Sequence, residues 1–338
     1  MSDAEARPVP PPEQWPLRPG LRVWQLLLLL AALVVMSISA ERTEMDRMVV
    51  LVGEGIAAAV GLREESEVAE GLARIGRDLL PLQISERRPL ERIENLDRDD
   101  LPWGARIEIE ETVESRLDPD TLETIERRRN REVLVEPWGY LLHALRLMLD
   151  TIEIAFWGTM IAVLLAMPLS FLGARGFAPR GLHHPSRALC SLLRAIPDLL
   201  AALFLVLAFG FGPIAGVLAL GLHTAGFLGK FFAEDIENAD PGPQNALRAI
   251  GASRLTVLRW AVLPQVLPSY VGYVQYILER NIRTATVIGV VGAGGIGQEL
   301  KGRFEMFDFG HVGTMLVVIF ATVMLLEHAT GRLRRRLI

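Results

Sequence analysis

The chain has 338 residues, 51% of them hydrophobic, with a mean hydropathy of +0.31 and a formal net charge of −5. Several uncharged apolar runs reach the roughly 20 residues that a helix needs to cross a bilayer, which excludes an ordinary soluble protein. The single cysteine, Cys190, excludes an intramolecular disulfide framework and a multi-cysteine metal site. The composition therefore predicts an all-α polytopic membrane protein.

The beginning of the chain combines a polar segment with an apolar one. Residues 1–20 are rich in proline and polar side chains, which predicts a disordered cytoplasmic tail. Residues 21–40 are apolar after Arg22 and predict a first transmembrane anchor. The same run ends at Ser39-Ala40, an acceptable context for signal-peptide cleavage, so a cleaved signal remains the alternative.

Residues 41–140 differ from the rest of the chain in composition. They are crowded with Glu, Asp and Arg, contain no Lys, and have an acidic excess. The alternation of Ile and Glu within 101–113 predicts a strand, and 119–131 predicts a helix with its basic end C-terminal. We expect a small acidic extracytoplasmic domain of α/β or irregular structure that serves as a solvated spacer.

Five more spans are predicted in the second half of the chain. The charge-free run 199–229 is too long for one helix and is broken by Gly210 and Pro213, so it predicts two spans joined by a tight outer turn. The other predicted spans are 154–173, 261–278 and 312–326. With the anchor, the sequence predicts about six transmembrane helices, five of them within a transmembrane domain at 141–338.

Positive charge in the short loops predicts the orientation. A short loop at 175–194, the segment 230–260 and the arginine-rich tail at 332–336 all carry Arg or Lys. The positive-inside rule places these segments in the cytoplasm. Both ends of the chain are therefore expected in the cytoplasm, with residues 41–140 outside.

The segment 241–264 (PGPQNALRAIGASRLTVLRWAVLP) predicts two short helices on the cytoplasmic side. Residues 244–250 form the first helix, Gly251 ends it, and Ser253 begins the second. Its arginines keep the segment out of the lipid. A compact basic helix-turn-helix suits docking to a partner protein, and an ordinary amphipathic loop is the alternative.

A glycine-rich run, GAGGIG, follows the fifth predicted span and matches G-x-G-x-x-G. It lacks the βαβ context and the following acidic residue of a dinucleotide site. Glycine-rich backbone at membrane depth has to be buried or line a polar cavity. The run therefore predicts a helix break along a translocation path. The residues assigned to this path are Gly292, Gly294, Gly295 and Gly297.

Ionisable side chains near the spans are the remaining candidates for chemistry. Arg283 is expected to line the path and to donate bidentate hydrogen bonds to a passing anion, the alternative being that the arginines lie at the outer surface with Arg280 paired to Glu279. His223 is expected to be a buried, hydrogen-bonded residue, with a proton relay as the alternative, and Asp198 is expected to be solvated or capping. No metal site is predicted, since His183-His184 lack further ligands. No phosphate-binding loop is present in the sequence, so ATP hydrolysis would require another chain.

Residues 151–338 resemble the permease subunit of phosphonate-importing ABC transporters, which have the type I importer fold. The resemblance rests on the segments RAIPDLL, LHTAGFLGKFFAEDIEN and TATVIGVVGAGGIGQ. It covers a little over half of the chain, and no such match is found in the first 150 residues beyond a plausible first span.

In that family a cytoplasmic loop, here 231–264, carries the pattern E-A-A, three residues, Gly, nine residues, I-x-L-P, and docks in a groove of the ATPase subunit. The resemblance implies the same coupling role for Asn245, Ala246, Leu247, Gly251, Leu263 and Pro264. Asn245 stands where the pattern has Glu, which removes an ion pair with the ATPase but keeps a hydrogen-bonding side chain.

The resemblance also implies the partners. A homodimer of this chain would work with an ATPase dimer that binds ATP and Mg and with a periplasmic or lipid-anchored phosphonate-binding protein, in the bacterial cytoplasmic membrane. The chain itself is expected to be a transport subunit rather than an enzyme, with no cofactor of its own and no nucleic-acid partner. The alternatives are a methionine- or betaine-type ABC permease and a secondary transporter.

Overall fold

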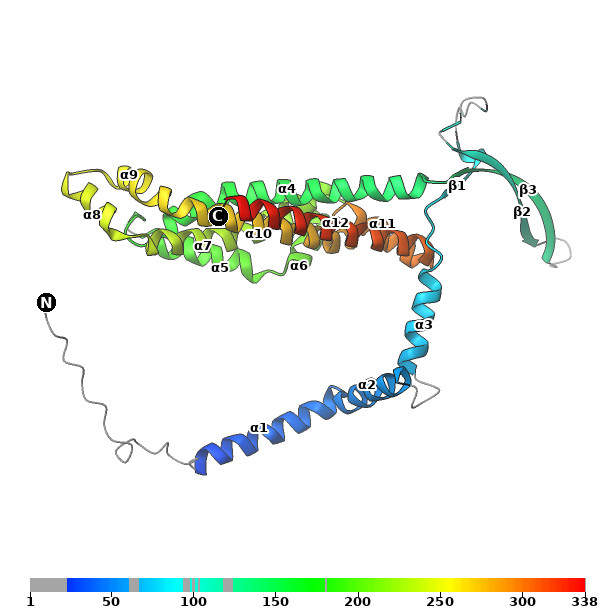
Figure 1. Ribbon diagram of the computed structural model, residues 1–338, viewed down its shortest axis with the longest axis horizontal. Coiled ribbons are helices and arrows are strands. Elements are labelled where there is room, and N and C mark those ends of the chain that lie inside the picture. The colour runs from blue at the N-terminus through cyan, green and yellow to red at the C-terminus, as the bar shows by residue number, and fades with distance from the viewer. Residues whose placement is uncertain are drawn as a thin grey trace. The chain divides into compact units, whose positions relative to one another are not determined.

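The computed structural model describes residues 23–60, 67–93, 98, 101, 102, 104–117, 124–179 and 181–337 (Figure 1). The chain divides into two compact units, Met1–Arg77 and Asp78–Ile338, which are described separately. The predicted tail at 1–20 lies outside the described residues.

The first unit contains helices α1 (Val23–Arg42) and α2 (Met45–Ala59) and most of α3 (Glu67–Leu79). Helix α1 has 20 residues, and none of them is buried. Its leucine-rich surface is long enough to cross a bilayer core and would be solvated by lipid tails. This helix corresponds to the predicted anchor at 21–40.

A three-stranded antiparallel sheet opens the second unit. Its strands are β1 (Glu86–Pro89), β2 (Arg106–Leu117) and β3 (Thr124–Glu136), in the order β1-β3-β2. The strand predicted within 101–113 is confirmed by β2, whereas the helix predicted at 119–131 is wrong, because its described part, 124–131, belongs to β3. Opposite charges face each other across the hairpin, as at Glu110 and Arg131, and such cross-strand pairs favour the sheet.

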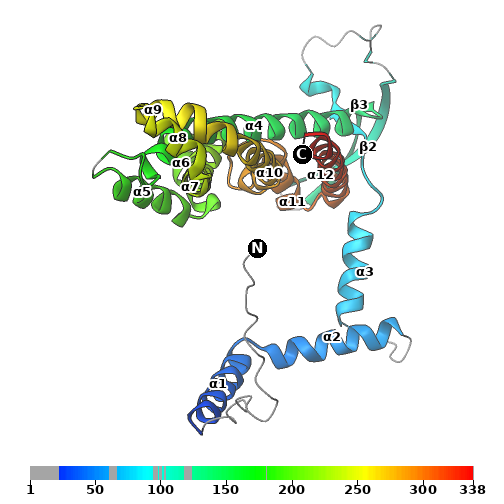
Figure 2. The same cartoon turned by 60° about the vertical axis from the view of Figure 1, so that its left-hand side comes forward.

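Helices make up the rest of the second unit. The long ones are α4 (Gly139–Gly173), α7 (Pro213–Asn238), α10 (Leu263–Gly289) and α12 (Phe309–Leu337). The shorter ones are α5 (His183–Ala195), α6 (Asp198–Phe209), α8 (Pro241–Ala249), α9 (Arg254–Val257), the π-helix η3 (Leu258–Val262) and α11 (Ile296–Glu305). Helix α4 runs along the bundle, with α8 and α9 near one end and β3 at the other (Figure 1, Figure 2).

Small residues let α4 and α7 approach closely at the centre of the bundle. A Cβ added at Gly158 would lie 2.8 Å from the Cβ of Leu220. Ala155, Ala162 and Ala166 are fully buried on the same helix. Close backbone approach through glycine and alanine is typical of helix packing in membranes, where van der Waals contact replaces the hydrophobic effect.

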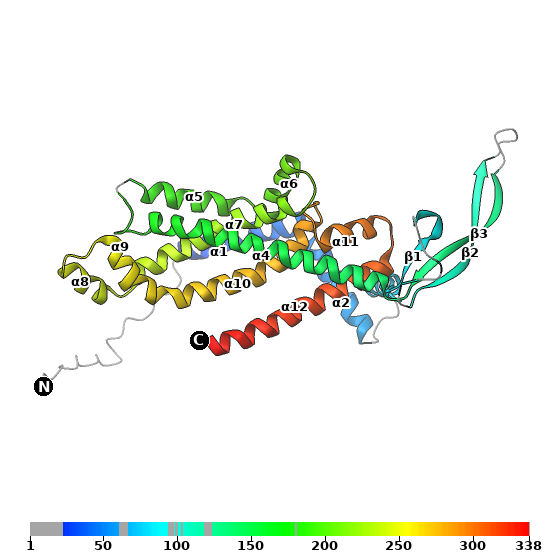
Figure 3. The ribbon, with the colours of Figure 1, turned by 90° about the horizontal axis from the view of Figure 1, so that it is seen from above.

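Four helices of the described residues are long and apolar enough to cross a membrane, namely α1, α4, α7 and α12. The pair α5–α6, bent by 89°, would make a fifth span (Figure 3). The predicted span at 261–278 corresponds to α10, which contains Glu279, Arg280 and Arg283 and is not among these candidates.

Three boundaries differ from those predicted. The short loop expected at 175–194 contains α5, whose polar and apolar residues alternate at helical spacing. Helix α6 has 12 residues and is too short to cross alone, so it needs α5. Helix α10 continues to Gly289 instead of being interrupted after residue 278. For α10, the sequence prediction ends the span at the charged side chains of Glu279 and Arg280, which lie inside a helical run.

Candidate functional site

The predicted helix-turn-helix is present as α8 and α9. Asp240 caps α8 by accepting a hydrogen bond from the amide of Gly242 at 2.9 Å. Gly251 follows α8 with a φ of 80°, the left-handed conformation in which glycine costs least. The Ser253 hydroxyl then caps α9 by accepting from the amide of Thr256 at 3.2 Å. The break at Gly251 and the cap at Ser253 agree with the sequence prediction, whereas α8 begins at Pro241, three residues before the predicted start at 244.

One face of this element is fastened to the bundle. The amide of Asp240 donates to the Gln265 side chain at 2.9 Å, and Gln244 is buried and donates to the carbonyls of Ala239 and Asp240. On the α9 side, Val257 is buried. The element is therefore held as a rigid extension of α7 and α10.

The other face is exposed and apolar. Ile250, Leu255 and Trp260 are 79%, 75% and 67% exposed. Asn245 and Ala246 are exposed beside them, and Leu247 is half-buried. Large apolar side chains on a short rigid element, away from the long apolar spans, are typical of a protein-docking surface. We call α8, α9 and these exposed side chains the coupling surface.

Leu263 and Pro264 lie where α9 passes into α10. The chain is helical without a gap from Arg254 to Gly289, with η3 between α9 and α10. Pro264 has no amide hydrogen, and its ring would clash with the carbonyl four residues earlier in a regular α-helix. The wider turn of the π-helix relieves this clash, so Pro264 is accommodated without a break.

The glycine-rich run forms the connection between α10 and α11. The Gly212 amide donates to the Gly292 carbonyl at 3.0 Å, and the Ile296 amide donates to the Thr151 hydroxyl at 2.9 Å. Gly292, Gly294 and Gly295 all have positive φ values. A Cβ at Gly292 would clash with the ring of Phe211. The predicted helix break is therefore a tightly packed turn against the α6–α7 connection, and its place in a translocation path stays a prediction.

The arginines of α10 pair differently from the expected alternative. Arg283 pairs with Glu279 at 3.2 Å, one helical turn away, and is 47% exposed. Arg280 instead reaches Asp198 on α6 at 3.3 Å. The expected Glu279–Arg280 pair is wrong because neighbouring helical residues point about 100° apart, whereas residues four apart share a face.

His223 and Asp198 meet at the α5–α6 bend. Nδ1 of His223 donates to the carbonyl of Ile196 at 2.9 Å, and its Nε2 lies 3.0 Å from Asp198. The buried, hydrogen-bonded role predicted for His223 is confirmed. The sequence predicts that Asp198 is solvated or capping. It begins α6, but the solvated role is wrong, since its side chain is only 17% exposed and faces both His223 and Arg280.

Replacement of Arg283 tests its predicted contact with the passing anion. Arg283→Ala should lower substrate uptake about tenfold, the effect of losing one charge-assisted hydrogen bond, and Arg283→Lys should retain part of the activity. The measurement is uptake per amount of assembled protein in the membrane. Normal uptake by Arg283→Ala would remove Arg283 from the path.

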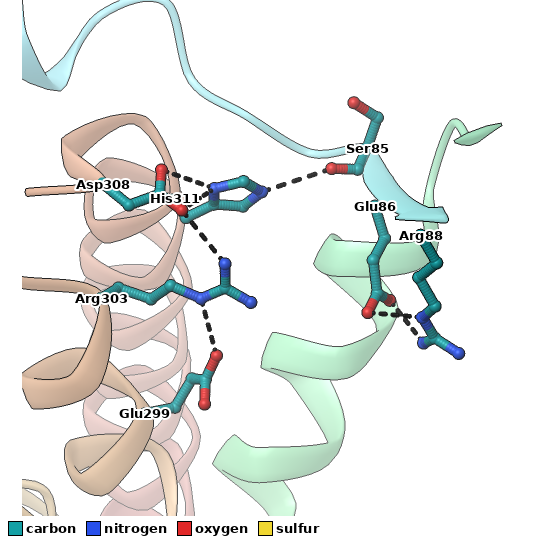
Figure 4. Close-up of polar contacts among 7 residues, drawn as sticks. All are labelled: Ser85, Glu86, Arg88, Glu299, Arg303, Asp308 and His311. Atoms are coloured by element: carbon teal, nitrogen blue, oxygen red, sulfur yellow. Dashed lines mark hydrogen bonds and ion pairs between the residues drawn. The ribbon is translucent and has the colours of Figure 1, made fainter. Parts of the chain in front are cut away.

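A polar network that sequence reasoning missed joins the start of the second unit to α11 and α12 (Figure 4). Arg303 donates to Glu299 at 2.8 Å and to Asp308 at 3.1 Å. His311 lies 2.7 Å from Asp308 through Nδ1 and 3.4 Å from the carbonyl of Ser85 through Nε2. The spacing Asp308-x-x-His311 at a helix start was the available signal. The network fixes the chain before β1 against the bundle.

Charge pairing lowers the pKa of two carboxyl groups at this end of the second unit, one in the network and one on β1. Burial raises the pKa of Asp308, but the hydrogen bond from His311 and the charge of Arg303 outweigh it, and the net pKa lies below its ordinary value. The hydrogen bond from Arg88 lowers the pKa of Glu86. Both groups are thus held ionised, as structural ion pairs require. No cluster of three metal-ligating side chains occurs among the described residues.

Comparison with known proteins identifies the family. Residues 166–335 match the model of the family described as binding-protein-dependent transport system inner membrane component. The chain belongs to this family. It is a multi-pass membrane permease of an ABC importer, a transport subunit rather than an enzyme, and the family implies an ATPase and a substrate-binding protein as partners.

Relatives of the permease are named for phosphorus compounds. HtxE of Stutzerimonas stutzeri, named for a phosphite transport system, is 51% identical over 259 residues, which cover 76% of this chain and 99% of HtxE. This match is longer than 151–338, so it reaches into the first 150 residues, where no match was expected. The phosphite transport system permease protein PtxC of the same organism is 44% identical over 56% of this chain and 70% of its own length.

A solved structure agrees with the fold. The MetNI methionine ABC transporter in an inward facing conformation superposes with a TM-score of 0.50 at 21% identity, covering 57% of this chain and 95% of that one. At this identity the likeness concerns the fold alone. It confirms the type I importer permease fold that the sequence predicted.

Proposed function

We propose that the permease translocates phosphonate or a related phosphorus oxyanion across the bacterial cytoplasmic membrane, driven by ATP hydrolysis on a separate subunit. The observation that carries the proposal is the 51% identity to HtxE over 99% of that protein. A second relative, PtxC, supports the same class of substrate. A methionine- or betaine-type substrate has the likeness of fold and a weaker sequence similarity, at 24–26% identity, in its favour.

The coupling surface is the proposed contact with the ATPase dimer. Asn245, Ala246 and Leu247 on α8, with Gly251 and the Leu263-Pro264 pair, would transmit ATP-driven closure to the spans as rigid-body alternating access. The exposed Ile250, Leu255 and Trp260 would supply the apolar anchor of that contact. ATP and Mg belong to the partner subunit, and no cofactor is assigned to this chain.

A contact with a cytoplasmic ATPase also orients the permease. It places α8 and α9 inside, so that α4 begins outside and α12 ends inside. Both chain ends are then cytoplasmic, and the sheet lies outside, on the side where a periplasmic or lipid-anchored binding protein delivers the ligand. A second copy of the permease would complete the path, as two inner surfaces are needed to enclose it.

Uptake by the assembled transporter tests the proposed substrate. The permease is expressed with its ATPase and binding protein in cells that lack other uptake systems for phosphorus oxyanions, and cell-associated label is measured with phosphite, methylphosphonate and phosphate. Saturable uptake of at least one of them is expected, with none in cells that lack the permease. Uptake of methionine or betaine and of no phosphorus compound would overturn the proposal.

A further inference from the structure

Five side chains from four helices meet beneath the 89° bend between α5 and α6. Asp198 begins α6, and its carboxylate lies 3.0 Å from Nε2 of His223 and 3.3 Å from Nη2 of Arg280. Phe227 lies one turn after His223 on α7, with ring centroids 5.2 Å apart. The group, which we call the bend cluster, consists of Arg194, Asp198, His223, Phe227 and Arg280.

The bend cluster holds more fixed positive than negative charge. Arg194 and Arg280 place their guanidinium carbons 5.2 Å and 5.0 Å from the centre of the Phe227 ring. A cation–π contact orients a guanidinium group but uses none of its N–H donors. Among the described residues, no acceptor lies within hydrogen-bonding distance of the buried Nε of Arg194. The bend cluster thus holds two guanidinium groups and one carboxylate, and the carboxylate of Asp198 pairs with Arg280.

The bend cluster lies deep within the membrane-spanning part of α7. Along α7, His223 lies about 15 Å from Pro213 and about 22 Å from Asn238 at the rise of an α-helix, so the cluster is well inside the span. Ionisable side chains at such depth are costly and usually mark a substrate or ion pathway. The side chains of Arg280 and Asp198 are 29% and 17% exposed, so the cluster lies just beneath a surface of the chain.

We propose that the bend cluster is a binding site for the phosphorus oxyanion on its way through the membrane. This inference rests on the proposed function. Arg280 and Arg194 donate to the anion's oxygens, a geometry for which guanidinium groups are suited. Asp198 pairs with Arg280 when the site is empty, and the bound anion replaces Asp198 as the partner of Arg280. His223 positions the bend, because its Nδ1 is bonded to the Ile196 carbonyl.

Removal of each guanidinium group tests the site. Arg280→Gln and Arg194→Gln should each lower uptake of phosphite by the assembled transporter by about tenfold or more, while binding-protein-stimulated ATP hydrolysis continues. Arg187→Gln is the matched control, because Arg187 also lies on α5 and pairs across to α7, with Glu237 at 3.0 Å. The control should keep its uptake.

Asp198→Asn distinguishes an anion-binding site from an ion pair that is only structural. Without the competing carboxylate, the purified permease in lipid nanodiscs should bind radiolabelled phosphite several-fold more tightly than the wild type, and Arg280→Gln should not bind it. If the bend cluster only holds the helices together, Asp198→Asn should lower the amount of assembled permease and should not bind phosphite more tightly. That result would overturn the inference.

The two proposals fail in different ways. If the wild-type transporter takes up no phosphorus oxyanion, the proposed function is wrong and the site assignment falls with it. If the wild type takes up phosphite and both Arg280→Gln and Arg194→Gln do so equally well, the proposed function stands and the bend cluster is not on the path.

Discussion

Gly251→Val should abolish transport while leaving the permease inserted in the membrane. Gly251 has a φ of 80°, a conformation that costs a β-branched residue on the order of 1–2 kcal/mol or more. No heavy atom lies within 4 Å of the Cβ that the substitution adds, so the bundle is not disturbed. The strain is relieved by changing the angle between α8 and α9, and this angle shapes the coupling surface.

Three measurements separate this outcome from misfolding. The amount of Gly251→Val in the membrane should equal that of the wild type, uptake should fall to background, and ATP hydrolysis by the co-purified ATPase should continue without transport. Gly251→Asn is the control, because asparagine adopts the left-handed conformation more readily and should retain most of the uptake. Wild-type uptake by Gly251→Val would show that the angle does not transmit force.

Gly297→Val should have the opposite phenotype, loss of the assembled protein. A Cβ at Gly297 would clash with the carbonyl of Thr286 and lie 3.0 Å from the Cα of Gly289. These are backbone atoms of α10, which cannot rotate away, so a cost of about 3 kcal/mol or more is expected. The position is one of closest approach between α10 and α11.

The measurement is the yield and thermal stability of the detergent-extracted permease. Gly302→Val on the same helix is the matched control, since no atom lies within 4 Å of its added Cβ. It should lose no stability, because valine favours a helix slightly more than glycine does. Equal stability of the two variants would mean that α11 does not pack against α10 as described.

Local signals made the coupling element predictable from the sequence. Gly251 and Ser253 act on their own backbone, through a left-handed turn and a side-chain cap, and need no distant partner. The apolar runs of α1, α4, α7 and α12 are similarly local, because the bilayer itself acts as the solvent that selects them.

Distant partners explain what could not be predicted. The arginine- and glutamate-rich β3 has the composition of a helix, and only its pairing with β2 makes it a strand. Asp198 and Arg280 are remote in sequence, and nothing near either residue indicates the other. Pro197 marks the break between α5 and α6 in the sequence, but nothing local indicates which distant helices lie against the bend.

The helical run from Arg254 to Gly289 has a mechanical consequence. Because η3 accommodates Pro264 without a break, α9 and α10 form one lever roughly 50 Å long at the rise of an α-helix. Its short arm carries part of the coupling surface, and its long arm carries Arg280. A rotation imposed on α9 therefore changes the separation of Arg280 from Asp198, which lies on another helix. Binding of the phosphorus oxyanion by Arg280 would therefore depend on the movement that the ATPase imposes on α9.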